Sequence, residues 1–471
     1  MKYIVYFLGL MLCGGTAFAQ ESLVDFGRFG NLHIYLPNGE PDSVVLFVSG
    51  DGGWNEGVVD MARLLPEMGA MVVGIDIRHY LSELRKSRDK CTSLAVDFEN
   101  LSHALQKKYG LKDHKSPILV GYSSGATLVY ATLVQAPVGT FAGGVSLGFG
   151  PDLDVPTALC PGAGLRYTIG KKGTFFFTPF SELKSPWIVL QGQQDQVVNP
   201  ADTNAFVAKT GTAKVVQLPL VGHGFSKPVN WEPQFRASFK EIVDRSQSPA
   251  VAIPAVHDLP LHEVTATGSS DYLAVLLTGD GGWAGLDQEL AAQLAARGVP
   301  VVGFNSLKYF WTKRTPDEAA GAVANVIRNY LAAWRKQHVI LIGYSFGADV
   351  LPFIVNRLPI DVRTHIANVS LLGLSAEASF EIHVADWIPG NVSRGQPIEP
   401  EIAKISGVSM LCLYGTSDKD DLCPKLSAQN IAKEPIDGGH HFGGSYAMLA
   451  DRILAFKDQH QDSRKRGNQV F

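Results

Sequence analysis

Two serines in this chain lie at the centre of a Gly-x-Ser-x-Gly motif, and an aspartate and a histidine follow each of them in the same order. The two sets are Ser123, Asp195 and His223, and Ser345, Asp418 and His440. In hydrolases built on a parallel sheet, such a serine attacks a carbonyl carbon, the histidine takes its proton, and the acid orients the histidine. The order of these residues therefore predicts two catalytic triads for ester hydrolysis.

Repetition makes this signal specific, because a single Gly-x-Ser-x-Gly is a weak motif on its own. Both copies, at 121–125 and 343–347, follow a short apolar run. The alternative for each aspartate is a turn or capping carboxylate, and for each histidine a residue of a glycine-rich turn. In the second set His441 competes with His440, and alignment with the Gly-His pair of the first set favours His440.

A second repeated motif precedes each serine. The sequence Gly-Asp-Gly-Gly-Trp occurs at 50–54 and again at 279–283. In this kind of hydrolase, a loop after an early strand supplies one backbone N–H to the oxyanion, and the residue after the nucleophile supplies another. We expect these donors at Asp280 or Gly281 with Phe346 in the second half, and at Asp51 or Gly52 with Ser124 in the first.

The glycine-rich motif has two other interpretations. A phosphate-binding loop is one, but no Lys-Ser or Lys-Thr follows the glycines, as a P-loop requires. The other is a structural hydrogen-bonding role for Asp51 and Asp280, which explains their recurrence equally well.

Two residues of the second half are candidates for substrate binding. Asp349 lies one helical turn after Ser345, where the first half has Thr127, and a carboxylate there could bind a cationic group. Its alternative is an acid favoured by the helix dipole. Tyr309 belongs to the aromatic segment 308–311, which resembles a second such segment at 174–180. Each segment is a candidate apolar cap over a lipid, with burial in the core as the alternative.

Apolar runs alternate with helical stretches in both halves. We expect strands at 44–48, 71–77, 118–120, 143–147, 187–190 and 215–218, and again at 272–277, 299–304, 339–342, 369–372 and 408–413. Such continuous apolar runs are typical of parallel strands covered on both faces. The predicted fold class is therefore α/β, with two tandem α/β-hydrolase-like domains, each a mostly parallel sheet flanked by helices.

The ends of the chain and a proline-containing segment set the domain boundaries. We place a signal peptide at 1–19, an N-terminal domain at 20–247, a linker at 248–258 and a C-terminal domain at 259–471. Lys2, the apolar run 3–12 and the small residues at 17–19 have the order of a secretory signal. A membrane anchor is the alternative, but the run is shorter than the roughly 20 residues of a spanning helix. Cys13 raises a lipoprotein alternative, which the large Leu12 before it disfavours.

Beyond that segment the chain has four cysteines, two in each half. They are Cys91 and Cys160, and Cys412 and Cys423. Even numbers after an export signal indicate disulfides, which we expect within each half. Closing the second pair would hold Asp418, which lies between its cysteines. Together these features predict an exported protein.

Composition excludes several classes of function. The formal net charge of −4 provides no basic surface for nucleic acid, so we expect no nucleic-acid partner. No C-x-x-C or H-E-x-x-H pattern indicates a zinc site. We therefore expect neither a metal nor a cofactor.

The motifs of the second half together resemble the VirJ-like bacterial virulence proteins in their two-domain, AcvB-type form. The segments that carry the resemblance are 278–283, 309–311, 343–352, 413–423 and 438–442, and the first half matches more loosely through its own two motifs. The resemblance implies a periplasmic α/β-hydrolase that cleaves aminoacylated phosphatidylglycerol, notably lysyl-phosphatidylglycerol. It also implies Ser345 as the nucleophile, with Asp418 and His440 as partners, and a link to type IV secretion.

We therefore predict a periplasmic serine esterase that removes the aminoacyl group from a modified phospholipid at the bilayer surface. Asp349 is the residue we expect to contact a cationic amino acid. One alternative is an interaction protein of a type IV secretion or envelope apparatus whose hydrolase sites are relics, which two intact sets of residues disfavour. The other is a carboxylesterase acting on a different substrate.

Overall fold

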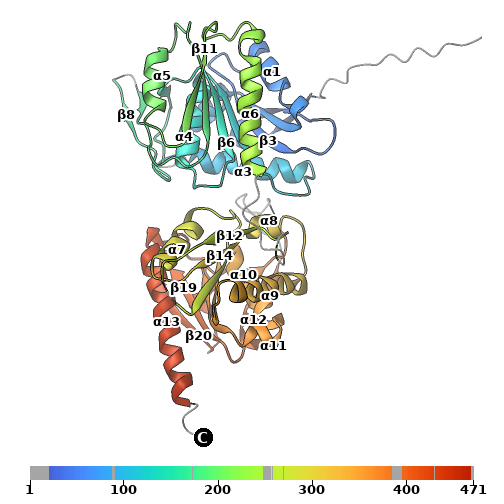
Figure 1. The fold of residues 1–471 in the computed structure, drawn as a ribbon, viewed down its shortest axis with the longest axis vertical. Coiled ribbons are helices and arrows are strands. Elements are labelled where there is room, and N and C mark those ends of the chain that lie inside the picture. Colours follow the sequence, from blue (N-terminus) through green and yellow to red (C-terminus); the bar gives the residue numbers. More distant parts are fainter. Residues whose placement is uncertain are drawn as a thin grey trace, which may run out of the picture.

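The computed structural model describes residues 21–86, 91–171, 173–247, 256, 258–268, 270–383, 395–428 and 430–467. These residues form two halves, each built on one main sheet with helices on both faces (Figure 1). The predicted α/β fold class is therefore confirmed. The predicted signal peptide at 1–19 and most of the predicted linker at 248–258 lie outside the described residues.

An eight-stranded sheet forms the centre of the first half. In spatial order its strands are β1 (Glu21–Asp25), β2 (Asn31–Tyr35), β4 (Ala70–Ile75), β3 (Ser43–Val48), β5 (Ile118–Tyr122), β6 (Gly143–Leu147), β10 (Trp187–Gly192) and β11 (Ala213–Leu218). β2 pairs antiparallel with β1 and β4, and every other pair is parallel. The helices are α1 (Glu56–Arg63), α2 (Ile77–Leu84), α3 (Leu94–Lys108), α4 (Ser124–Gln135), α5 (Pro200–Val207) and α6 (Glu232–Gln247).

A seven-stranded sheet forms the centre of the second half. Its strands, in spatial order, are β12 (Leu261–Val264), β14 (Val301–Phe304), β13 (Tyr272–Leu277), β15 (His338–Tyr344), β16 (Ile366–Leu372), β19 (Ser409–Gly415) and β20 (Ile431–Ile436). Only the β12 pair is antiparallel in this sheet. The helices are α7 (Gly285–Ala296), α8 (Ser306–Tyr309), α9 (Pro316–Ala333), α10 (Phe346–Arg357), α11 (Ile360–Arg363), α12 (Glu399–Lys404) and α13 (Tyr446–Gly467).

Smaller sheets lie outside these two. β7 (Asp152–Asp154), β9 (Thr174–Phe177) and β8 (Tyr167–Ile169) form one, and β17 (Glu377–Ala378) pairs with β18 (Gln396–Pro397) in another. β9 contains the first part of the aromatic segment 174–180. Phe175 and Phe177 of this strand are buried in the core of the first half, and Phe176 between them is exposed.

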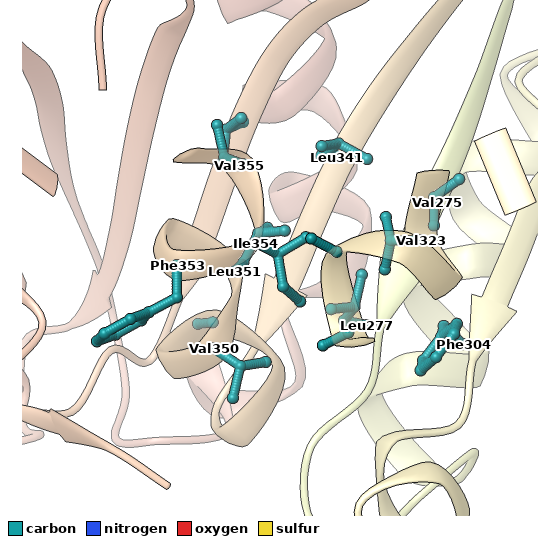
Figure 2. Close-up of a cluster of buried hydrophobic side chains, with 14 of the residues drawn as sticks. Val275, Leu277, Phe304, Val323, Leu341, Val350, Leu351, Phe353, Ile354 and Val355 are labelled. Atoms are coloured by element: carbon teal, nitrogen blue, oxygen red, sulfur yellow. The ribbon is translucent and has the colours of Figure 1, made fainter. Parts of the chain in front are cut away.

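The continuous apolar strands pack on both faces, which explains their composition. In β13, Leu273, Val275 and Leu277 belong to one buried cluster, whereas Ala274 and Leu276 belong to another on the opposite face. Because side chains alternate along a strand, each residue contributes to one layer only. Figure 2 shows the first of these layers, where side chains of β13, β14 and β15 pack against those of α9 and α10.

The two halves contact each other through α3 of the first half and the segment after α8 of the second (Figure 1). Trp311 Nε1 donates a 2.8 Å hydrogen bond to the Leu111 carbonyl oxygen, and the Trp311 ring packs 5.1 Å from the ring of His114. Lys107 Nζ donates to the Trp311 carbonyl and lies 3.6 Å from a Glu381 carboxylate oxygen. Trp311 of the aromatic segment 308–311 therefore joins the halves instead of covering a pocket.

None of the helices within the described ranges contains a stretch that is both long and apolar enough to cross a bilayer.

Candidate active site

Both motif serines lie at a sharp turn between a strand and a helix. Ser123 joins β5 to α4, and Ser345 joins β15 to α10. Their backbones are left-handed, with φ of 55° at Ser123 and 51° at Ser345, which is unusual for a residue other than glycine. This strained turn presents the serine hydroxyl above the carboxyl ends of the strands, as in a nucleophile elbow.

The glycines of the motif allow the helix to approach the neighbouring strand closely. A Cβ atom on Gly125 would lie 2.4 Å from the Ser49 carbonyl oxygen, and one on Gly347 would lie 2.2 Å from that of Leu277. Such distances are far below van der Waals contact, so any side chain there would push the helix from the sheet. The glycines therefore fix the position of each serine.

The second half brings Ser345, His440 and Asp418 together. His440 Nε2 lies 2.9 Å from Ser345 Oγ, and His440 Nδ1 lies 2.8 Å from an Asp418 carboxylate oxygen. His441 instead has its Nδ1 2.8 Å from the hydroxyl of Tyr344. The geometry is that of a nucleophile, its base and the acid that orients the base.

The first half contains the same arrangement. His223 Nε2 lies 2.9 Å from Ser123 Oγ, and His223 Nδ1 lies 2.8 Å from an Asp195 carboxylate oxygen. The Asp195 side chain has no exposed surface, and that of His223 is only 15% exposed, compared with 40% for His440. Two complete sets of groups that can activate a serine are therefore present.

The Gly-Asp-Gly-Gly-Trp loops lie directly beside the serines. A Cβ atom on Gly50 would be 3.1 Å from Ser123 Cβ, and one on Gly279 would be 3.5 Å from Ser345 Cβ. Asp280 and Gly281 line the same pocket as Ser345, and Asp51 and Gly52 line a pocket with Ser123. Phe346 and Ser124 begin their helices, where backbone N–H groups have no acceptor within the helix. The expected oxyanion donors are thus gathered near each serine.

The tryptophan of each loop has a structural role. Trp54 covers Gly74 of β4, where a Cβ would lie 2.2 Å from the indole, and Trp283 covers Gly303 of β14, where it would lie 2.0 Å away. Only glycine leaves room for the ring on the neighbouring strand. The loop is therefore held against the sheet by its tryptophan.

Neither proposed substrate-binding side chain lies in the Ser345 pocket. Asp349 is only 8% exposed, and one of its carboxylate oxygens accepts a 2.8 Å hydrogen bond from the Ser375 backbone N–H. Burial raises the pKa of Asp349 to about 8. Tyr309 is also 8% exposed, and its hydroxyl donates to the Glu318 carbonyl oxygen. Both expectations are corrected: these side chains support the loop after β16 and the core.

The Ser345 pocket has a volume of about 510 Å³ and is lined by residues of both halves. From the second half come Gly279, Asp280, Gly281, Gly282, Ala284, Gly285, Leu286, Asp287, Tyr344, Ser345, His440, His441 and Tyr446, and from the first half come Glu99, Pro137 and Thr140. Sequence reasoning missed Glu99 and Asp287. Neither had a signal in the repeats, since the first half has Val58 at the position of Asp287 and Glu99 belongs to no repeated motif.

The Ser123 site has two cavities, of about 420 and 390 Å³, which share Ser123 and Asp51. Counted from the shared Gly-Asp-Gly-Gly-Trp motif, Val58 occupies the place of Asp287. Val58 lines the first of these cavities. The two serine pockets therefore differ in polarity at equivalent positions.

Acidic groups near Ser345 have raised pKa values. Burial, and then the charge of Asp280, raises the pKa of Glu99 to about 8. Burial also raises the pKa of Asp287 well above its usual range. The pKa of Asp421, in the loop after Asp418, is raised to about 6 by burial and by Asp418 itself. Across the described ranges, no group of three or more His, Cys, Asp or Glu residues is arranged to hold a metal ion.

Both expected disulfides are present, Cys91 with Cys160 and Cys412 with Cys423. The first closes next to the start of α3, and the second encloses Asp418 between β19 and the short helix Cys423–Lys425. Disulfides persist in oxidising compartments, which indicates an exported protein.

The fold and the two serine sites define an α/β serine hydrolase. The chain belongs to the bacterial virulence protein (VirJ) family, whose model matches residues 42–140 and 271–461, more than half of the chain.

Several solved structures are similar to part of the chain. Est1E from Butyrivibrio proteoclasticus shares 14% identity with a TM-score of 0.33, and covers 48% of this chain and 99% of its own. An α/β serine hydrolase without a lid from Xanthomonas campestris shares 18% identity with a TM-score of 0.33, and covers 48% and 95%. A dienelactone hydrolase from Anabaena variabilis shares 20% identity with a TM-score of 0.34, and covers 47% and 96%. Comparison with curated proteins gives no match.

Proposed function

We propose that this protein is a periplasmic serine esterase that hydrolyses the aminoacyl ester of aminoacylated phosphatidylglycerol, with lysyl-phosphatidylglycerol as the reference substrate. The observation that carries the proposal is the Ser345–His440–Asp418 set, which opens into a pocket of about 510 Å³. Membership of the VirJ family and the two disulfides support the substrate class and the compartment.

In the proposed reaction, Ser345 Oγ attacks the aminoacyl carbonyl carbon while His440 Nε2 takes its proton. Backbone N–H groups at Phe346 and in the Asp280–Gly281 turn stabilise the oxyanion. His440 then gives the proton to the departing glycerol oxygen of the lipid, which leaves an acyl-enzyme on Ser345. A water molecule, deprotonated by His440, hydrolyses this ester and releases the free amino acid.

Asp418 orients His440 and stabilises its charged form in this scheme. The Ser123 set has equivalent geometry, and we propose that it too can be acylated. One of its cavities has Val58 in place of Asp287, whereas the other is lined by Asp51, Asp152 and Asp154. We assign the lipid reaction to the second half because the VirJ family model covers Ser345, Asp418 and His440 but neither Asp195 nor His223.

The test is release of lysine from phosphatidylglycerol vesicles that contain lysyl-phosphatidylglycerol. The purified wild type is compared with Ser345→Ala, Ser123→Ala and the double variant. We expect release to be lost in Ser345→Ala and retained in Ser123→Ala. If a fluorophosphonate probe labels Ser345 in the wild type but no lysine is released, the lipid substrate is wrong.

A further inference from the structure

The first half contributes an acidic side chain to the pocket of the second-half serine. Glu99 lies on α3, in the first half, yet it lines the pocket that contains Ser345 and His440. α3 lies on the side of the first half that faces the second (Figure 1). Glu99 also lines a smaller adjoining cavity, of about 60 Å³, together with Lys308 and His262 of the second half.

Close backbone packing holds this part of the first half in place. A Cβ atom on Gly139 would lie 3.3 Å from the Trp283 carbonyl oxygen, and one on Gly285 would lie 3.7 Å from the ring of Pro137. Gln288, at the start of α7, donates from Nε2 to the Val138 carbonyl. The wall of the Ser345 pocket is therefore incomplete without the first half.

Asp287 points to the kind of ligand that this pocket could bind, independently of Glu99. It is 3% exposed, lines the pocket, and has a carboxylate oxygen, Oδ1, without any hydrogen-bond partner. A buried oxygen without a partner is costly, and burial disfavours the charged form of the Asp287 carboxyl group unless a cation pairs with it. Among the described residues, none forms an ion pair with Glu99 or Asp287. A positively charged donor entering the pocket would satisfy both groups.

We propose that Glu99 and Asp287 form a subsite, shared between the two halves, that binds the ammonium group of the acyl part of the substrate. The inference rests on the proposed function and specifies its substrate class: esters whose acyl group carries a cation. Asp280 adds negative charge beside this subsite. At Ser123 the position equivalent to Asp287 is Val58, so an acid is absent from that position of the first site.

An ammonium group fits this subsite better than a metal ion does. It carries N–H donors that can each reach a different acceptor, and charge-assisted hydrogen bonds of this kind are strong. The described residues contain no cluster with the arrangement of metal ligands.

Equilibrium binding tests the subsite without depending on turnover. Calorimetric titration of the full chain carrying Ser345→Ala uses three amides with the same six-carbon chain: lysinamide, norleucinamide and hexanamide, with two, one and no ammonium groups. Glu99→Gln and Asp287→Asn are then added singly. Asp113→Asn, which removes a charge from an exposed side chain outside the pocket, is the matched control.

We expect lysinamide and norleucinamide to bind more tightly than hexanamide. Glu99→Gln and Asp287→Asn should each weaken the two cationic amides about tenfold, as expected for loss of one charge-assisted hydrogen bond. Hexanamide should be unaffected, and Asp113→Asn should change nothing. Equal affinities for lysinamide and hexanamide, no detectable binding of any amide, or equal losses in Asp113→Asn would each overturn the subsite.

Two hydrolysis assays distinguish failure of the subsite from failure of the proposed function. Lysine ethyl ester and lysyl-phosphatidylglycerol vesicles present the same acyl group on a soluble and on a lipid alcohol. One outcome is that lysinamide binding depends on Glu99 and that the enzyme cleaves the ethyl ester but not the lipid. This outcome would support the subsite and reject the lipid substrate. Alternatively, Glu99→Gln and Asp287→Asn could leave the rate of lipid cleavage unchanged. That result would support the esterase and reject the subsite.

Discussion

The indole Nε1–H of Trp311 donates a 2.8 Å hydrogen bond to the carbonyl oxygen of Leu111, and this contact joins the two halves of the chain. Trp311 is only 1% exposed. Replacement by phenylalanine keeps an aromatic ring but leaves a buried carbonyl without its donor, which costs roughly 1–3 kcal/mol. Because the same junction places Glu99 beside Ser345, Trp311→Phe should lower both the free energy of unfolding and the preference for cationic esters. Urea unfolding and paired ester assays measure these two effects.

Trp334→Phe is the control for that substitution, since Trp334 packs against Tyr330 within the second half. It should leave the ester preference unchanged. An unaltered preference in Trp311→Phe, despite lower stability, would show that the junction does not set the pocket.

Asp418→Asn should abolish most of the lipid hydrolysis while the protein stays folded. Asp418 accepts from His440 Nδ1, and an amide there would favour the wrong tautomer of the histidine. We expect kcat to fall about 10³–10⁴-fold with little change in KM. The matched variant Asp195→Asn changes the same contact at Ser123. If Asp195→Asn instead removes the lipid activity, the assignment of the two sites is reversed.

Loss of the Cys412–Cys423 disulfide should reduce catalysis more than binding. The bridge closes a short loop that contains Asp418, and loops of this size are stabilised by about 3 kcal/mol when cross-linked. The double variant Cys412→Ser, Cys423→Ser should therefore unfold at lower urea and have a lower kcat. An unchanged kcat would show that the loop keeps Asp418 in place without the bridge.

The Cys91–Cys160 disulfide should affect a different kinetic constant. It closes just before α3, the helix that carries Glu99. Removing it by the double serine variant should raise KM for a cationic ester while leaving the kcat/KM for a neutral ester nearly unchanged. Equal losses for both esters would indicate a general loss of stability.

Most of the sheet strands and the triad residues could be predicted because short sequence patterns indicate both. Each predicted strand is an apolar run of the kind that parallel sheets require, and each serine lies between two glycines that the helix–strand contact demands. Strands β1, β2, β12 and β20 lie at or next to the sheet edges and were missed, because their sequences are only partly apolar. Contacts between segments that are distant in the sequence could not be predicted either.

Asp349 and Glu99 show why the pocket could not be predicted in full. Spacing places Asp349 one turn after Ser345, but spacing does not reveal that the loop after β16 covers that face of the helix and supplies the Ser375 N–H. From the sequence alone, Glu99 is an ordinary polar residue of an amphipathic helix. Its place beside Ser345 depends on how two separately patterned halves pack together.

The titratable groups around Glu99 determine how its pH dependence can be measured. Those lining the two cavities that it borders are Asp280, Asp287, Tyr344, His440, His441, Tyr446, His114, His262 and Lys308. Burial lowers the pKa of His262 to about 4 and that of His114 well below its usual range, so both are neutral above pH 6. Burial also lowers the pKa of Lys308. The ratio of the kcat/KM values for two esters, measured on the same protein, cancels the effects that these groups have on both reactions.

Preference for a cationic ester should increase from pH 6 to about pH 9 and then level off. With a pKa of about 8 in the empty pocket, Glu99 is mostly protonated at pH 6 and must lose its proton before it can pair with a cation. KM should therefore fall about tenfold in all as Glu99 ionises, the same factor as expected for Glu99→Gln. The measurement compares ethyl 6-aminohexanoate, whose ammonium stays charged up to about pH 10, with ethyl hexanoate. Glu99→Gln should reduce the pH slope of the ratio of their kcat/KM values, with the remaining slope due to Asp287, and a slope that Glu99→Gln leaves unchanged would assign it to another group.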